Sequence, residues 1–195
     1  MYTLSKSDKE LIKRCKLFKC VRDNNTKTFS EMLDVENINW DLDGRTLLQH
    51  AIRERKPDIL QIMLDFSNSH NCALDIHSRS NGSVLHMGSY FNLRGMQHIG
   101  SFRQSRDQRF KREILSLLLK FDNADPNCYH VQNWTPLQTA ILYGDETICE
   151  VLINCEKCDV NCKGNIERSP LQLACSLGKI DIVTMLLNRG CELDC

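Results

Sequence analysis

The chain has 195 residues, enough for one ordinary domain or a short solenoid with a buried core. Its 25 lysine and arginine residues balance 25 aspartate and glutamate residues, so the net charge favours neither nucleic acid nor an anionic membrane. No apolar stretch approaches the ~20 residues of a membrane helix, and the charged N-terminus does not resemble a secretory signal. We therefore expect a cytoplasmic or nuclear protein without membrane insertion, whose eleven cysteines are mostly reduced thiols.

Residues 1–42 are expected to form a helical capping repeat. Ser7 and Glu10 have the spacing of a capping box, which predicts that a helix begins there. The pair Asn24–Asn25 indicates a turn, and a second short helix is predicted over Thr28–Leu33.

A short motif then occurs four times along the chain, and each copy is followed by two helical apolar patterns. The copies are Thr46–Gln49, Ser83–His86, Thr135–Gln138 and Ser169–Gln172. The Thr or Ser at the first position can cap a helix, and Pro136 and Pro170 suit the first helical turn, where a missing N–H does no harm. The interval between the second and third copies is longer than the others, which indicates an insertion.

The complete pattern is Thr-Pro-Leu-x-x-Ala, a Gly, an apolar second helix and then Asp-Val-Asn, and it resembles the ankyrin repeat. The resemblance covers about residues 40–195, and residues 169–195 match best. It implies an all-α fold, an ankyrin-repeat solenoid of stacked helix-turn-helix units with short β-hairpin fingers. The four ankyrin-like repeats of residues 43–195 are expected at about 43–78, 79–130, 131–164 and 165–195.

A basic insertion is expected at residues 91–112, within the second repeat. Its basic side chains include Arg94, Arg103, Arg106, Arg109 and Lys111. One interpretation is a loop for an acidic partner such as RNA or a phosphorylated peptide, and the other, which we favour, is a solvated surface loop. Its last basic residues are expected to begin the helix that Ile114 continues.

Cys155, Cys158 and Cys162 have a spacing that permits a shared zinc ion. No second Cys-x-x-Cys motif accompanies them, and the repeat pattern explains them as small packed residues, so we expect no metal and no cofactor. The sequence also lacks Gly-x-Ser-x-Gly, a phosphate-binding glycine loop and His-Glu-x-x-His. We therefore expect that the chain is not an enzyme.

The remaining hypothesis is a binding surface, because repeats of this kind present a concave face built from hairpin tips and first helices. Tryptophan, tyrosine and arginine are enriched at interface anchors. The expected partner-binding residues are Trp40, Arg53, Tyr90, Tyr129, His130 and Trp134. For Trp134 the alternative is that its ring packs on Tyr129 or on the next finger.

The predicted function is a non-catalytic protein–protein interaction module, such as an adaptor, an inhibitor or a targeting scaffold. Two alternatives remain open: the targeting region of a longer enzyme or channel, and a weak nucleic-acid binder that uses the basic insertion. The last repeat keeps apolar residues such as Ile182 and Leu186 without an obvious polar outer face. We expect this end to be covered by further repeats or by a partner.

Overall fold

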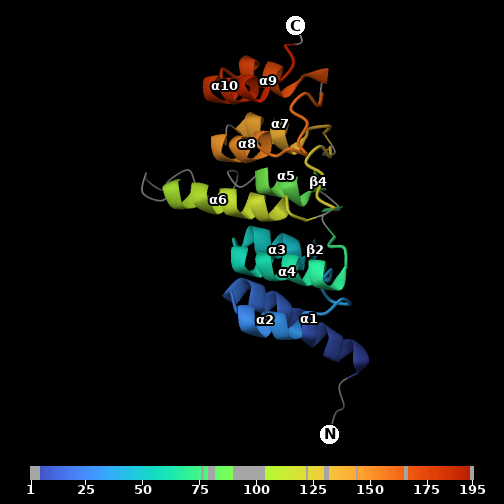
Figure 1. The fold of residues 1–195 in the computed structure, drawn as a ribbon. Coiled ribbons are helices and arrows are strands. Elements are labelled where there is room, and N and C mark those ends of the chain that lie inside the picture. The colour runs from blue at the N-terminus through green and yellow to red at the C-terminus, as the bar shows by residue number, and fades with distance from the viewer. Residues whose placement is uncertain are drawn as a thin grey trace. The chain divides into compact units, whose positions relative to one another are not determined.

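The computed structural model describes residues 5–75, 77–78, 82–89, 104–121, 123–129, 132–143, 145–164 and 167–193 (Figure 1). The chain divides into two compact units, unit 1 over Met1–Ile76 and unit 2 over His77–Cys195. Helices dominate both units, and the strands within the described ranges form only two-stranded antiparallel hairpins. The predominantly helical architecture predicted from the apolar patterns is confirmed.

Over residues 5–75, unit 1 contains two helical pairs and one hairpin. Its elements are α1 (Lys6–Asp23), α2 (Thr26–Met32), β1 (Asp41–Leu42), β2 (Arg45–Thr46), α3 (Leu47–Arg53) and α4 (Pro57–His70). Asp41 pairs with Thr46 across the hairpin, and the turn between the strands is made by Asp43 and Gly44, which both have positive φ. The turn therefore uses two residue types that tolerate left-handed backbone.

The first helix begins differently from the prediction. The capping box is formed by Ser5 and Asp8: Ser5 Oγ accepts from the Asp8 N–H at 3.1 Å, and the Asp8 carboxylate accepts from the Ser5 N–H at 3.1 Å. The predicted box at Ser7 and Glu10 is therefore wrong, because two serines compete within three residues and the earlier one makes both bonds. Asn25 caps α2 through the N–H of Thr28, so this helix begins at Thr26.

The core of unit 1 is aliphatic apart from two aromatic rings, Phe29, which is fully buried, and Phe18, which is 7% exposed. The other fully buried apolar side chains include Leu17, Val21, Ile38, Leu47, Ala51, Ile59, Leu60 and Met63. They come from all four helices and from the turn after α2, so burial of this cluster joins the two helical pairs of the unit.

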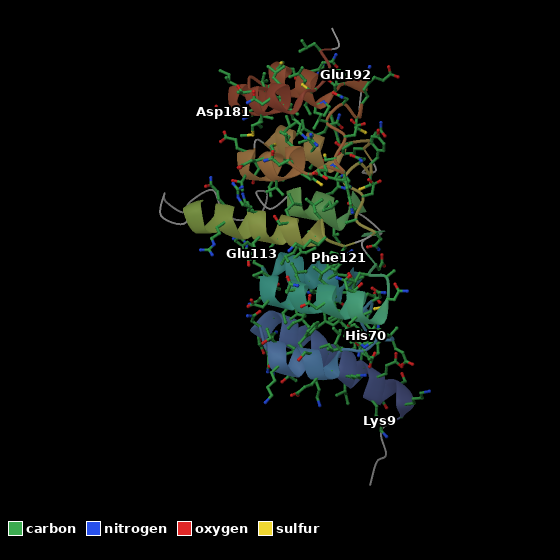
Figure 2. The ribbon with its side chains drawn as sticks, in the orientation of Figure 1. Lys9, His70, Glu113, Phe121, Asp181 and Glu192 are labelled. Atoms are coloured by element: carbon green, nitrogen blue, oxygen red, sulfur yellow. The ribbon has the colours of Figure 1, made fainter. Side chains whose placement is uncertain are left out.

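The described residues of unit 2 form one hairpin and three helical pairs. Its elements are β3 (His77–Ser78), β4 (Gly82–Ser83), α5 (Val84–Ser89), α6 (Gln104–Leu118), α7 (Pro136–Tyr143), α8 (Glu146–Ile153), α9 (Pro170–Ser176) and α10 (Ile180–Arg189). Within the unit, α5 packs on α6 and α7, α7 packs on α8 and α9, and α10 packs on α8 and α9. The side chains of this unit fill the spaces between its helical pairs (Figure 2).

The helix starts of unit 2 agree with the motif at its third and fourth copies. Ser169 Oγ accepts from the Gln172 N–H at 3.2 Å, and Gln172 Oε1 accepts from the Ser169 N–H at 3.0 Å. Pro136 and Pro170 are the first residues of α7 and α9, as predicted. Gly178 has φ +66°, and Arg55, which stands where the ankyrin pattern has Gly, adopts the same left-handed backbone with φ 57°.

Helix α6 overlaps the segment expected to be an insertion. It begins at Gln104, so residues 104–112 of the expected 91–112 are helical, and residues 91–103 lie outside the described ranges. Helix formation thus starts a turn and a half before Arg109, earlier than the sequence pattern suggested.

Candidate protein-interaction surface

Unit 2 fixes its loops through side chains that bond to the backbone of the next repeat. His86 is fully buried, and its Nε2 lies 2.8 Å from the carbonyl oxygen of Trp134. Because a carbonyl only accepts, Nε2 carries the proton, which leaves Nδ1 to accept from the Ser83 hydroxyl at 3.1 Å. The Ser83 hydroxyl oxygen in turn accepts a hydrogen bond from the Cys128 thiol at 3.0 Å. This chain of bonds holds the loop before α7 in place.

One repeat later, the side-chain amide of Gln138 holds the next loop by hydrogen bonds to its backbone. Its Oε1 accepts from the Thr135 N–H at 3.1 Å, and its Nε2 donates to the carbonyls of Cys162 and Arg168 at 3.2 and 2.8 Å. A Cβ on Gly164 would lie 1.9 Å from Gln138 Oε1, so only glycine fits there. This steric need was not predicted from the sequence.

Asparagines connect the hairpin fingers in a second row. Asn127 donates to the carbonyl of Lys157 at 2.8 Å and accepts from the Asp159 N–H at 2.7 Å. Asn161 accepts from the Glu192 N–H at 2.8 Å. The fingers of unit 2 are therefore held by their neighbours, and a partner meets a surface that is already ordered.

Apolar and aromatic side chains are exposed on the fingers and first helices of unit 2. Tyr129 is 48% exposed, Leu142 at the end of α7 is 37% exposed and Leu177 at the end of α9 is 43% exposed, whereas Trp134 is half-buried. We name these four residues the finger surface. Leu142 lies seven residues after Thr135, just as Arg53 lies seven residues after Thr46 and Tyr90 seven after Ser83. The same register could have identified Leu142, which sequence reasoning missed.

The ring of Tyr129 is exposed while its hydroxyl is engaged. The hydroxyl donates to the Lys163 carbonyl at 3.0 Å, and it also lies 3.0 Å from the Sγ of Cys162. The hydrogen bond with Cys162, together with burial, raises the pKa of Tyr129 to about 12. The phenol therefore stays neutral and joins two fingers.

The other expected anchors lie elsewhere. Trp40 is half-buried in unit 1, where the Lys13 ammonium and the Arg14 guanidinium lie 5.7 and 5.1 Å from its ring centroid. Arg53 is exposed at the end of α3, also in unit 1. Tyr90 and His130 lie outside the described residues. The structure thus brings Tyr129, Trp134, Leu142 and Leu177 into one unit and leaves Trp40 and Arg53 in the other.

Lys111 does not belong to the exposed basic surface that was expected for residues 91–112. It is buried, and its Nζ lies 2.5 Å from Asp145 Oδ2, with the two side chains 9% and 6% exposed. It forms part of the packing between α6 and α8, because the aliphatic stem and the paired charge are both removed from water. Arg109 is exposed on α6, Arg106 lies on α6 with its side chain outside the description, and Arg94 and Arg103 fall outside the described residues.

The three cysteines of the zinc hypothesis lie in the turns after α8. Cys158 is buried and Cys155 and Cys162 are half-buried, and burial raises the pKa of Cys158 to about 12. Among the described residues, no three Cys, His, Asp or Glu side chains are grouped so that they could hold a metal ion. Of the three, Cys158 packs as a small apolar group, whereas the Cys162 thiol contacts the Tyr129 hydroxyl.

A comparison with protein-family models identifies the repeats in the C-terminal part of the chain. Residues 107–195 match the family model for ankyrin repeats, described as three copies. Ankyrin repeats are generally protein–protein interaction modules, and the family is typically non-catalytic. Among the helices that the structure describes, none is long and apolar enough to cross a membrane. The motif copies, the paired helices and this match agree: residues 107–195 belong to the ankyrin-repeat family, and the chain has an all-α ankyrin-repeat fold.

Proposed function

We propose that this chain is a non-catalytic binding module that recognises a partner protein through the finger surface of unit 2. The observation that carries the proposal is the exposure of Tyr129, Leu142 and Leu177 on elements whose backbones are held by neighbouring repeats. Exposed aliphatic and aromatic groups on an ordered scaffold are what a protein interface needs at its centre.

Rigidity supports this function energetically. Binding to a loop that must first be ordered costs conformational entropy, whereas the loops around Trp134 and Tyr129 are already fixed by His86 and Asn127. The affinity of the module then depends on the side chains at its surface. Adaptor, inhibitor and targeting roles, and action in the cytoplasm or nucleus, are all compatible with this mechanism.

The structure also bears on the outer face of α10 and on the nucleic-acid alternative. Leu187 in α10 is 46% exposed, whereas its equivalent Ile153 in α8, which lies beneath the last helical pair, is 2% exposed. This contrast leaves an apolar outer face on α10, to which we propose that a partner protein binds. The nucleic-acid alternative loses support, because Lys111 and Arg112 are engaged with carboxylates of α8 and its cap.

The test begins with affinity capture of partners by the wild-type chain, followed by binary titration with each purified candidate. We expect Leu142→Glu with Leu177→Glu to weaken a genuine complex by about 2 kcal/mol or more, and Trp134→Ala to act in the same direction. Val35→Glu, at an aliphatic position in unit 1 that is even more exposed, is the control. Equal affinity of the double variant and the control for every purified partner would reject the proposed surface.

A further inference from the structure

The outer face of α1 combines lysines with exposed aliphatic side chains. Lys9, Ile12, Lys16 and Lys19 are spaced by three and four residues, which places them along one side of the helix. Ile12, within this row, is 41% exposed, and Leu11, about 100° around the helix from Ile12, is 56% exposed. We name these five residues the lysine face. The other side of α1 packs on α2 and α3, and Lys9 points away from the unit (Figure 2).

The positive charge of this face is not neutralised by α1 itself. The acidic residues of the helix are engaged elsewhere: Asp8 with the Ser5 hydroxyl at 2.7 Å, Glu10 with Arg14 at 3.7 Å and Asp23 with Arg22 at 3.2 Å. None of the ion pairs within the described part of the chain involves Lys9, Lys16 or Lys19. Three exposed ammonium groups therefore lie on the same side of α1 as the exposed Ile12, and Leu11 is exposed at the edge of that side.

We propose that the lysine face binds the surface of an anionic lipid bilayer. Protein interfaces are depleted in lysine and use aromatic and arginine anchors, and this face has neither. Nucleic acid would use the ammonium groups but offers nothing to Leu11 and Ile12. The headgroup layer of a membrane accepts both, since lysines lie near lipid phosphates and carboxylates while aliphatic side chains enter the boundary of the acyl chains.

This contact is peripheral and involves unit 1 only, so it is independent of the finger surface in unit 2. It lies parallel to the helix axis and buries only two aliphatic side chains. The binding is therefore weak, reversible and dominated by charge. A membrane rich in phosphatidylserine would concentrate the module on its surface and leave unit 2 to bind its own partner.

The experiment is sedimentation of the full chain with phosphatidylcholine vesicles that contain about 30% phosphatidylserine, compared with phosphatidylcholine alone. We expect binding only to the anionic vesicles at about 0.1 M salt and its loss at about 0.5 M salt. Each lysine near such a surface contributes about a fivefold gain, so Lys16→Gln with Lys19→Gln should weaken partitioning about 25-fold. Leu11→Ser with Ile12→Ser should weaken it as well, which adsorption by charge alone would not produce.

The matched control removes two exposed lysines of unit 2, Lys120→Gln with Lys157→Gln, and should bind as the wild type does. Circular dichroism checks that each variant is folded, which we expect for exposed positions. Equal binding to neutral vesicles, equal loss in the control, or an unchanged Leu11/Ile12 variant would overturn the proposal. The proposal would also be overturned if the chain did not bind the anionic vesicles but bound a short RNA or an acidic peptide through the same lysines.

Discussion

The ion pair between Lys111 and Asp145 should be one of the most sensitive points of unit 2. Both side chains are less than a tenth exposed, and the carboxylate also caps α8 by accepting from the Ile148 N–H at 3.2 Å. Removing one member leaves the other charge buried without its partner, which costs about 3–5 kcal/mol. Lys111→Met keeps the length of the stem while it removes the charge. For a unit of this size, that loss moves the urea midpoint by roughly 1.5–2.5 M.

The neighbouring pair gives a control on the same two helices. Arg112 and Glu150 are joined at 2.6 Å but remain 50% and 40% exposed, so solvent screens their attraction. The bond lowers the pKa of Glu150, yet Arg112→Met should cost no more than about 1 kcal/mol. Burial, rather than the presence of an ion pair, would then account for the difference between two adjacent residues of α6.

The measurement uses the two tryptophans, one in each unit. In a Trp40→Phe background, the fluorescence of Trp134 reports the unfolding of unit 2 alone. The double variant Lys111→Met with Asp145→Asn keeps an oxygen for the α8 cap and no longer buries a charge, so it should recover most of the loss. If the two single losses simply add, or if Lys111→Met costs less than about 1 kcal/mol, the buried pair does not act as we argue.

Burial lowers the pKa of His50 below its ordinary value of 6.5, so unfolding takes up a proton and unit 1 should lose stability as the pH falls below 6.5. His50→Gln should flatten this pH dependence of stability, measured by Trp40 fluorescence during urea unfolding at several pH values. The same pH dependence in the wild type and the variant would contradict this prediction. His86→Gln should be tolerated, because an amide makes the equivalent bonds in the next repeat. His86→Leu should cost about 2 kcal/mol by leaving the Trp134 carbonyl unbonded, as urea titration can show. A thiol reagent should label the exposed Cys15 rapidly and the buried Cys158 only on unfolding, and rapid native labelling of Cys158 would argue against its burial.

The helical pairs could be predicted because local chemistry decides them. A Thr or Ser cap, a proline at the first turn and an apolar pattern act within a few residues, and they gave the starts of α7 and α9. The start of α1 was predicted wrongly for the same local reason, since Ser5 and Ser7 are both plausible caps. Composition shows which residue types can cap, and only the folded geometry shows which one makes both bonds.

The binding surface was only partly predictable, because exposure depends on contacts between distant residues. From the sequence, Lys111 was expected to be a surface lysine. In the structure it is buried and paired with Asp145, which is 34 residues away in the chain. Leu142 and Leu177 had the character of core residues, since an aliphatic residue on a helix is usually buried. Both lie at the C-terminal ends of the first helices, α7 and α9, where they are exposed, and for Leu142 that position follows from the repeat register rather than from residue type.

Tyr129 shows how fold and function can be separated in this protein. Its hydroxyl belongs to the links between fingers, whereas its ring belongs to the exposed surface. Tyr129→Phe removes the bond to the Lys163 carbonyl and keeps the ring, so it should lower the stability of unit 2 by about 1 kcal/mol and spare partner binding. Tyr129→Ala removes both and should weaken binding as well. If the phenylalanine variant binds as poorly as the alanine variant, the orientation of the fingers, and not the exposed ring, determines recognition.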